Sequence, residues 1–274
     1  MALPGSIITL TTDFGVIDWY VACMKGIILG LDPHATIVDV THEIPPGDVR
    51  AGAITLGAFY PHFPPHSIHV VVVDPGVGSA RAALAIETDR CFFVGPDNGV
   101  LSLALDHEKI KTIRHLTNPR FHRPPVCSTF HGRDIFAPAA AHLSRGLAPA
   151  ELGPESPDYH KLDWPQPVIE DRQIRGELVY IDRFGNGITN ISSQALARWG
   201  SAVLAVAIPG RFQARLESFY QAVEPGQPLA LIGSTRHLEI AVNQGSAAKQ
   251  LALAIGAPVI VTPQSAIILK VTSY

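Results

Sequence analysis

Three polar residues of this chain could act together on a water molecule. Asp74 follows a β-branched run at 68–73, Arg81 ends the loop that comes after it, and His131 lies in a second polar loop at 128–134. An arginine is always charged and would hold a nearby carboxylate ionised, whereas a histidine exchanges its proton near neutral pH. Placed around one water, the three side chains could orient it and favour attack by its oxygen.

Two other interpretations of these residues stay open from the residues alone. Arg81 and Asp74 could form only a salt bridge across a turn, with His131 near them by chance. A metal site is the second alternative, because ligand types also occur at Asp13, His42, Glu43 and Asp97. None of them has the H-E-x-x-H spacing or a helical His pair, so we expect no metal. The chain also lacks a serine or cysteine nucleophile motif, which favours water as the nucleophile.

The first half of the chain alternates strands and helices, which predicts a mostly parallel sheet with flanking helices. The expected strands are 6–10, 36–40, 68–73, 82–87 and 91–94, and the expected helices are 21–28, 49–59 and about 135–145. Parallel strands end at one edge of a sheet, so Asp13, Asp74 and Asp97 should converge there. Pro138 fits only the first turn of a helix, which places His131 in the loop before it.

The second half has shorter strands separated by turn signals. Proline-rich sequence from about 148 suggests a linker, so we expect an α/β domain at 1–168 and a second domain at 169–274. The expected strands are 176–182, 187–191, 202–208, 212–216, 229–232, 237–242 and, in two pieces, 259–271, with a short helix at 247–255. This spacing is typical of an antiparallel sheet or small barrel.

Composition excludes several classes of protein. The chain has 274 residues, 47% of them hydrophobic, and a formal net charge of -3, with no basic run that would bind nucleic acid. No apolar segment approaches the roughly 20 residues that span a bilayer, and the first residues do not resemble a secretory signal. We therefore expect a cytoplasmic protein that does not bind membranes. Its three cysteines lack metal-ligand spacing and are expected to be reduced.

Six segments together resemble the S-adenosyl-L-methionine (SAM) hydroxide adenosyltransferase family, which is related to fluorinases and chlorinases. They read LTTDFG at 10–15, VVVDPGVGSAR at 71–81, VGPDNGVL at 94–101, TFHGRDIFAPAAAHL at 129–143, IDRFGNGITNI at 181–191 and LIGSTRHLEIAVNQGSAA at 231–248. The resemblance implies a Rossmann-like α/β domain, a C-terminal antiparallel β-barrel, and a homotrimer. Its active sites would lie between the N-terminal domain of one subunit and the C-terminal domain of the next.

The same resemblance assigns residues to roles. The catalytic residues of the family fall on Asp74, Arg81 and His131. The substrate-binding positions fall on Asp13 for the ribose, Asn186 for the adenine, Phe184 and Phe219 for stacking, Asp18, Asp182, Ser234 and Glu239 around the methionine part, and Val242 through its backbone. No metal or other cofactor is implied, because SAM is itself the substrate.

The reaction implied is hydrolysis of SAM to adenosine and L-methionine, with water attacking C5′ and the thioether leaving. The alternatives are a chloride-using halogenase that forms 5′-halo-5′-deoxyadenosine, and a non-catalytic protein that binds adenosine or SAM. Halogenating relatives carry Tyr at the position of Asp74, Ser at that of Gly132, and a long insertion near Arg90. His237 and the bulky Tyr220 also depart from the family pattern, which bears on the fit of the substrate.

Overall fold

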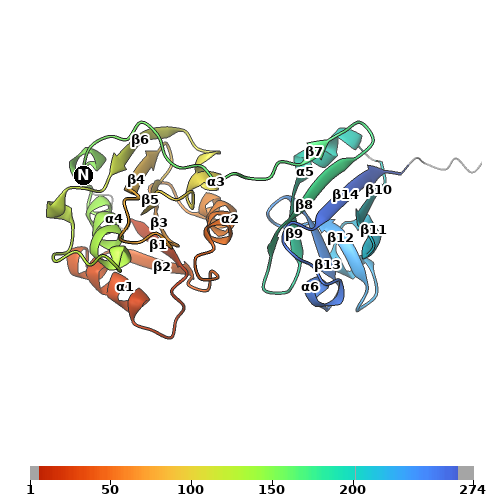
Figure 1. The fold of residues 1–274 in the computed structure, drawn as a ribbon, viewed down its shortest axis with the longest axis horizontal. Coiled ribbons are helices and arrows are strands. Elements are labelled where there is room, and N and C mark those ends of the chain that lie inside the picture. The colour runs from red at the N-terminus through yellow and green to blue at the C-terminus, as the bar shows by residue number, and fades with distance from the viewer. Residues whose placement is uncertain (1–5, 201, 265–274) are drawn as a thin grey trace, which may run out of the picture. The chain divides into compact units, whose positions relative to one another are not determined.

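The computed structural model describes residues 6–200 and 202–264. The chain divides into two compact units, Met1–Leu162 and Asp163–Tyr274 (Figure 1). Residues 148–162, which the sequence assigned to a linker, are held to the first unit. Ser156 N donates to Ile113 O over 2.9 Å, and His160 N donates to Asp97 Oδ1 over 2.6 Å. Within the described residues, no helix is long and apolar enough to cross a membrane.

The first unit is built on a six-stranded sheet with the order β2-β1-β3-β5-β4-β6. Its strands are β1 (Ile7–Thr12), β2 (Thr36–Thr41), β3 (Ile68–Val72), β4 (Ala83–Thr88), β5 (Phe92–Pro96) and β6 (Ile110–His115). β2, β1, β3 and β5 are parallel, whereas β4 is antiparallel to β5 and to β6. The expected parallel sheet is confirmed, and β6 is a strand that the sequence analysis did not predict.

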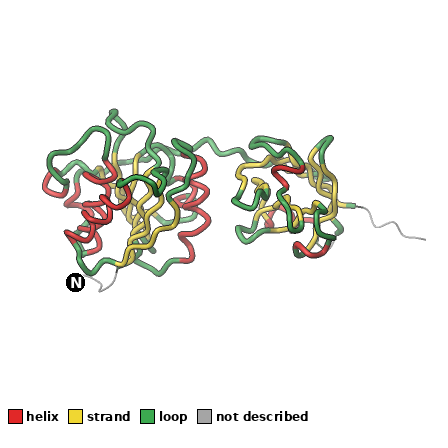
Figure 2. Tube along the Cα trace, turned by 90° about the horizontal axis from the view of Figure 1, so that it is seen from below, coloured by secondary structure: helices red, strands yellow, loops and turns green. Residues whose placement is uncertain are grey.

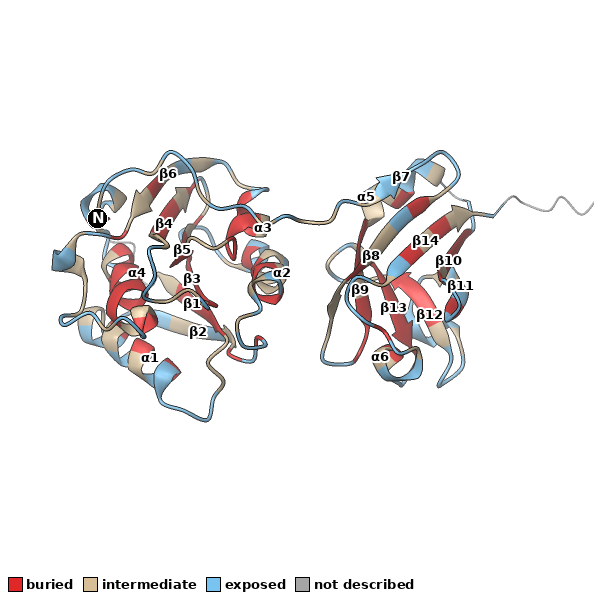
Figure 3. Cartoon of the chain, viewed as in Figure 1, coloured by how far each residue is buried: buried red, intermediate tan, exposed pale blue. Residues whose placement is uncertain are grey.

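Helices cover both faces of this sheet (Figures 1 and 2). α1 (Tyr20–Leu31) and α4 (Ala137–Ser144) pack together on one face, and α2 (Val49–Phe59) and α3 (Ser102–Leu105) on the other. Asp48 caps α2 as its Oδ1 accepts Ala51 N–H over 2.9 Å. α4 contributes buried alanines, whose small side chains allow the helix to lie close to the sheet. Because helices cover both faces of the sheet, the central strand β3 is buried along its whole length (Figure 3).

The second unit is a closed barrel with one extra strand. Its strands are β7 (Val168–Ile169), β8 (Ile174–Ile181), β9 (Gly187–Ser192), β10 (Leu204–Ile208), β11 (Phe212–Glu217), β12 (Pro228–Ile232), β13 (His237–Val242) and β14 (Pro258–Pro263). β14 pairs with both β10 and β8, which closes a ring of seven strands, and β7 adds to the edge of β8. Large apolar side chains from all around the ring fill its interior.

The barrel confirms the expected architecture but differs in detail. β11 and β12 run parallel, because the chain crosses over through the short helix Tyr220–Ala222 instead of turning back in a hairpin. α6 (Ala247–Gln250) is shorter than the expected helix at 247–255, since Ala252 has φ +49° and a helix needs negative φ. The second piece of the strand expected at 259–271 lies outside the described residues.

Candidate active site

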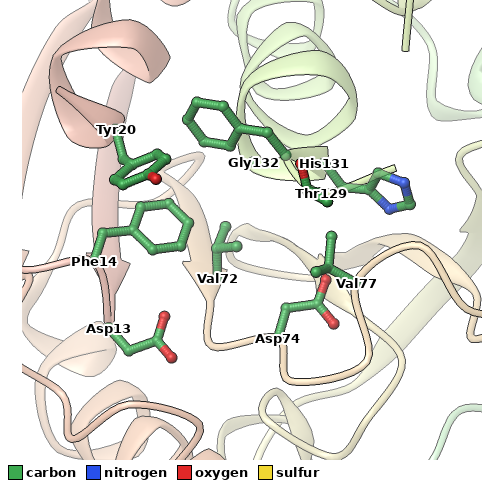
Figure 4. A pocket seen from close by; sticks show the side chains of 10 residues that line it. Asp13, Phe14, Tyr20, Val72, Asp74, Val77, Thr129, His131 and Gly132 are labelled. Atoms are coloured by element: carbon green, nitrogen blue, oxygen red, sulfur yellow. The ribbon is translucent and has the colours of Figure 1, made fainter. Parts of the chain in front are cut away.

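The carboxyl edge of β1 and β3 forms a pocket of about 350 Å³ (Figure 4). Asp13 and Asp74, which follow these two strands, both line it, as the sequence predicted. Asp97 follows β5 at the same edge but does not line the pocket. Its carboxylate instead accepts the N–H of His160 and so holds residues 148–162 against the sheet. Two of the three expected carboxylates therefore meet at one pocket.

Arg81 joins the other two predicted catalytic residues. Its Nε donates to Asp74 Oδ1 over 2.9 Å, its Nη2 donates to Asp74 Oδ2, and the same Nη2 lies 2.7 Å from Nδ1 of His131. Asp74 and Arg81 are nearly buried, with 4% and 10% of their side chains exposed. Phe136 stacks against the guanidinium with 5.5 Å from Cζ to the ring centre. The salt bridge and the histidine contact therefore exist together.

Burial and the neighbouring arginine together favour the neutral form of His131. A guanidinium can only donate hydrogen bonds, so Nδ1 of His131 must accept, and the proton of the neutral ring lies on Nε2. Burial, followed by the positive charge of Arg81, lowers the pKa of His131 below its usual value. The lowered pKa favours the neutral imidazole at pH 7, with its Nε2–H free to donate a hydrogen bond.

A close contact between two loops brings Arg81 and His131 together. Gly78 has φ +78°, and a Cβ at this position would overlap the carbonyl oxygen of Ser128. Only glycine fits both the left-handed backbone and this approach. The loop from β3 to Arg81 therefore lies directly against the segment that leads to His131.

His131 does not lie in a loop, as the sequence analysis expected, but at the start of a helical segment. A π-helical turn, η3 (Gly132–Phe136), precedes α4, and Ala137 N donates to Gly132 O. Pro138 cannot donate to the carbonyl of Asp134, which accepts Arg123 N–H over 2.9 Å instead. The wide turn gives the proline ring room, so the helix extends further toward the N-terminus than Pro138 predicts.

In the second unit, the turn between β8 and β9 carries three of the predicted residues, Asp182, Phe184 and Asn186. Asp182 Oδ1 accepts the backbone N–H groups of Phe184 and Asn186 over 2.9 and 2.8 Å, and Oδ2 accepts the side-chain amide of Asn186 over 3.2 Å. Asn186 is buried, whereas Phe184 is 76% exposed. The turn thus presents an aromatic face next to an oriented amide, which suits a heterocyclic base.

Glu239 forms a second polar group on the same barrel. It is buried on β13, beneath the segment that begins at Phe219, and Tyr220 Oη donates to its Oε1 over 2.7 Å. Burial, and then the nearby Asp182 carboxylate, raises the pKa of Glu239. Two carboxylates close enough to interact favour a positively charged ligand.

The four remaining predicted residues lie at different places in the two units. Ser234 lies in the exposed turn before β13, and Val242 ends that strand, so the strand's length of roughly 17 Å separates them. Phe219 is exposed beside Tyr220. Asp18 lies in the exposed segment before α1, outside the lining of the pocket.

Several pocket residues were missed by the sequence analysis. Phe14, Tyr20 and Thr129 also line the pocket (Figure 4). Phe130 lines it as well. Phe14, Tyr20 and Phe130 pack against one another, with ring centres 5.2 to 5.9 Å apart. Phe14 follows Asp13 directly at a strand end, and this position was the available signal. Among the described residues, no three His, Cys, Asp or Glu side chains are grouped so that they could hold a metal ion.

Both parts of the chain match models of one protein family. Residues 8–153 match the SAM hydroxide adenosyltransferase N-terminal domain, and residues 176–260 match the SAM hydroxide adenosyltransferase C-terminal domain. The chain belongs to the SAM hydroxide adenosyltransferase family. The resemblance inferred from the six sequence segments is therefore confirmed.

Several known proteins are similar to the chain over most of its length. The (R)-S-adenosyl-L-methionine hydrolase of Thermus thermophilus is 39% identical over 90% of this chain and 96% of its own. The (R)-S-adenosyl-L-methionine hydrolase of Salinispora arenicola is 38% identical over 91% of this chain and 95% of its own. A fluorinase of Actinoplanes is 26% identical over 93% of this chain and 97% of its own. A conserved protein of Thermotoga maritima has a crystal structure that matches with a TM-score of 0.87 at 35% identity, over 93% of this chain and 99% of its own.

Proposed function

We propose that this protein hydrolyses S-adenosyl-L-methionine to adenosine and L-methionine. The observation that carries the proposal is the shared guanidinium of Arg81, which holds the Asp74 carboxylate and the His131 imidazole side by side next to the pocket. The names of the relatives with 38 and 39% identity support it, and they suggest the (R) epimer at sulfur as the substrate.

The chemistry asks little of the protein beyond alignment. The sulfonium is already a good leaving group, so no acid is needed at sulfur. The water oxygen forms a bond to C5′ while the C5′–S bond breaks, and the bonding electrons stay on sulfur as the thioether of methionine. The proton lost by the water passes to the Asp74 carboxylate and from there to solvent. Holding a water in line with the C5′–S bond is worth several kcal/mol, and in this proposal that alignment is the task of the Asp74, Arg81 and His131 cluster.

The proposal assigns binding roles to the other predicted residues. Asp13 binds the ribose hydroxyls, and Asn186 reads the adenine, with Phe184 and Phe219 stacking on the ligand. Asp18, Asp182, Ser234 and Glu239 surround the methionine part, and Val242 contacts the ligand through its backbone. No metal or other cofactor takes part, so dialysis against a chelator should leave the activity unchanged. We also propose a cytoplasmic location, which cell fractionation would test.

The proposal includes a homotrimer whose sites each combine two subunits. Exposed apolar side chains support it, since Ile17 is 97% exposed and Trp19 66% in the segment that follows the Asp13 loop. Exposed apolar side chains that lie together are typical of interfaces. Mixing inactive Asp74→Ala and Asn186→Ala subunits should restore part of the activity, because some sites would pair two intact halves. If each site lies within one chain, mixing restores nothing.

One experiment tests the reaction itself. The pure protein is incubated in ¹⁸O-water with each sulfur epimer of SAM, and the adenosine is analysed by mass spectrometry. We expect ¹⁸O at the 5′ position, and the (R) epimer should react faster. In added chloride or fluoride we expect no 5′-halo-5′-deoxyadenosine. If no adenosine forms from either epimer, the proposal is wrong.

A further inference from the structure

A chain of polar side chains connects the Asp13 loop to the surface of the first unit. Thr12, the last residue of β1, is fully buried, and its Oγ1 lies 2.9 Å from Nδ1 of the buried His42. Nε2 of His42 lies 3.1 Å from Oδ1 of Asp39, whose other oxygen accepts from Lys25. The groups therefore form one continuous series from helix α1 to the end of β1.

The contact between His42 and Asp39 is an ion-pair distance and lacks the alignment of a hydrogen bond. A bare nitrogen lone pair this close to a carboxylate oxygen would be repelled, which favours the tautomer with its proton on Nε2. In that tautomer Nδ1 accepts from the Thr12 hydroxyl. The Thr12 oxygen in turn accepts the backbone N–H of Phe14 over 3.2 Å. The series thus ends on the backbone immediately after Asp13.

The backbone is shaped to make this series possible. In a regular strand, residues three apart point to opposite faces, so Asp39 and His42 would not meet. The register between β1 and β2 shifts, because Leu10 is opposite Asp39 and Thr11 is opposite Thr41. Val40 is therefore an extra residue, and this bulge turns His42 back toward Asp39.

The segment that contains His42 also holds the Asp13 loop directly. Gly15 N donates to the carbonyl of His42 over 2.7 Å, and Gly47 N donates to Oδ2 of Asp13 itself over 2.8 Å. Thr12 and Gly15, which lie on either side of Asp13, are therefore bonded to His42. The Asp13 carboxylate is bonded to Gly47, five residues after His42 in the chain.

We propose that Thr12 and His42 are positioning residues that hold the Asp13 carboxylate toward the nucleoside part of the ligand. This inference depends on the proposed function, in which Asp13 binds the ribose. Neither residue lines the pocket, so each acts through Asp13. Loss of the series should weaken nucleoside binding and leave the alignment of the water at Asp74 unchanged.

The chain offers a matched control for the test. Thr9, also fully buried on β1, has its Oγ1 2.9 Å from Nδ1 of the buried His69, but this pair is remote from the Asp13 loop. Thr9→Val and Thr12→Val therefore remove the same kind of hydrogen bond from the same strand. Both should lower the melting temperature by a similar amount.

Only Thr12→Val should raise the dissociation constant of adenosine, measured by calorimetry, and the KM for SAM, each roughly tenfold with kcat nearly unchanged. Thr12→Ser, which keeps the hydroxyl, should restore both values. His42→Gln should raise them as Thr12→Val does, and serves if the valine variant does not fold. If Thr9→Val and Thr12→Val change KM equally, or if kcat falls instead, the inference is wrong. A wild-type protein that neither binds adenosine nor cleaves SAM would instead overturn the proposed function.

Discussion

Nη2 of Arg81 contacts the carboxylate of Asp74 and the imidazole of His131 at the same time. One nitrogen thereby fixes the orientation of both groups, keeps the carboxylate next to a positive charge, and selects the tautomer of the histidine. A salt bridge alone would need no histidine at Nη2. The arrangement therefore favours the functional interpretation of these residues over a turn that is merely stabilised by an ion pair.

Arg81→Lys should lower kcat for SAM hydrolysis by about 100-fold or more, because an ammonium cannot make the paired contact with Asp74 and still reach His131. Arg175→Lys is the control, since Arg175 forms an exposed ion pair with Glu170. Circular dichroism would establish that both variants fold. A kcat within threefold of wild type for Arg81→Lys would contradict the role assigned to the guanidinium.

The activity should fall on the acid side of the pH profile. Burial and the charge of Arg81 lower the pKa of His131, so the neutral form persists to more acidic pH than for a free histidine. Protonation would place an N–H of His131 against Nη2 of Arg81, which breaks their hydrogen bond. We expect kcat/KM to stay level from pH 8 to about 6.5 and to decline only below that. His131→Gln should remove this decline, and an acid limb beginning above the usual histidine pKa would disagree with the structure.

Gly78→Ala should reduce activity more than a Gly→Ala change that introduces only the strain of a positive φ. The new Cβ would overlap the Ser128 carbonyl and push apart the loops that bring Arg81 to His131. Gly210→Ala is the matched control, because Gly210 has φ +72° but open space around it. Both variants should lose about 1 kcal/mol of stability from strain. Only Gly78→Ala should also lose at least tenfold in kcat, and equal kcat values would show that the loop contact is unimportant.

Tyr220→Phe should raise the KM for SAM about three- to tenfold with little effect on kcat. Burial raises the pKa of Tyr220 to about 12, so its hydroxyl donates to Glu239 throughout the working pH range. Without this donor, Glu239 takes up a proton more easily and binds a cationic ligand less well. Tyr159→Phe, a change in the other unit, serves as the control. A lower kcat at constant KM would instead place Tyr220 near the reacting atoms.

The strongly patterned elements could be predicted from sequence, and the features that depend on distant partners could not. The apolar run of β3 and the helical pattern at 49–59 are local signals, and both are confirmed. β6 was missed because IKTIRH carries charges along a half-buried strand at the edge of the sheet. The parallel pairing of β11 with β12 depends on a crossover that no turn motif announces.

The site divides in the same way. Asp13 and Asp74 were expected at one edge because they follow parallel strands, and the pocket contains both. The prediction that His131 lies in a loop was wrong. The π-helical turn depends on Arg123, whose N–H donates to the Asp134 carbonyl that Pro138 leaves free. Tertiary contacts of this kind override the local rule that a proline marks the first turn of a helix.

The π-helical turn makes the catalytic geometry sensitive to the number of residues in this segment. Deleting one residue between Gly132 and Phe136 would let the segment wind as an ordinary α-helix continuous with α4. Each residue of such a helix advances about 100° around the axis. His131 would then swing away from Arg81, while the fold on either side stayed intact. A family member one residue shorter here would therefore have to recruit its imidazole from another position or work without one.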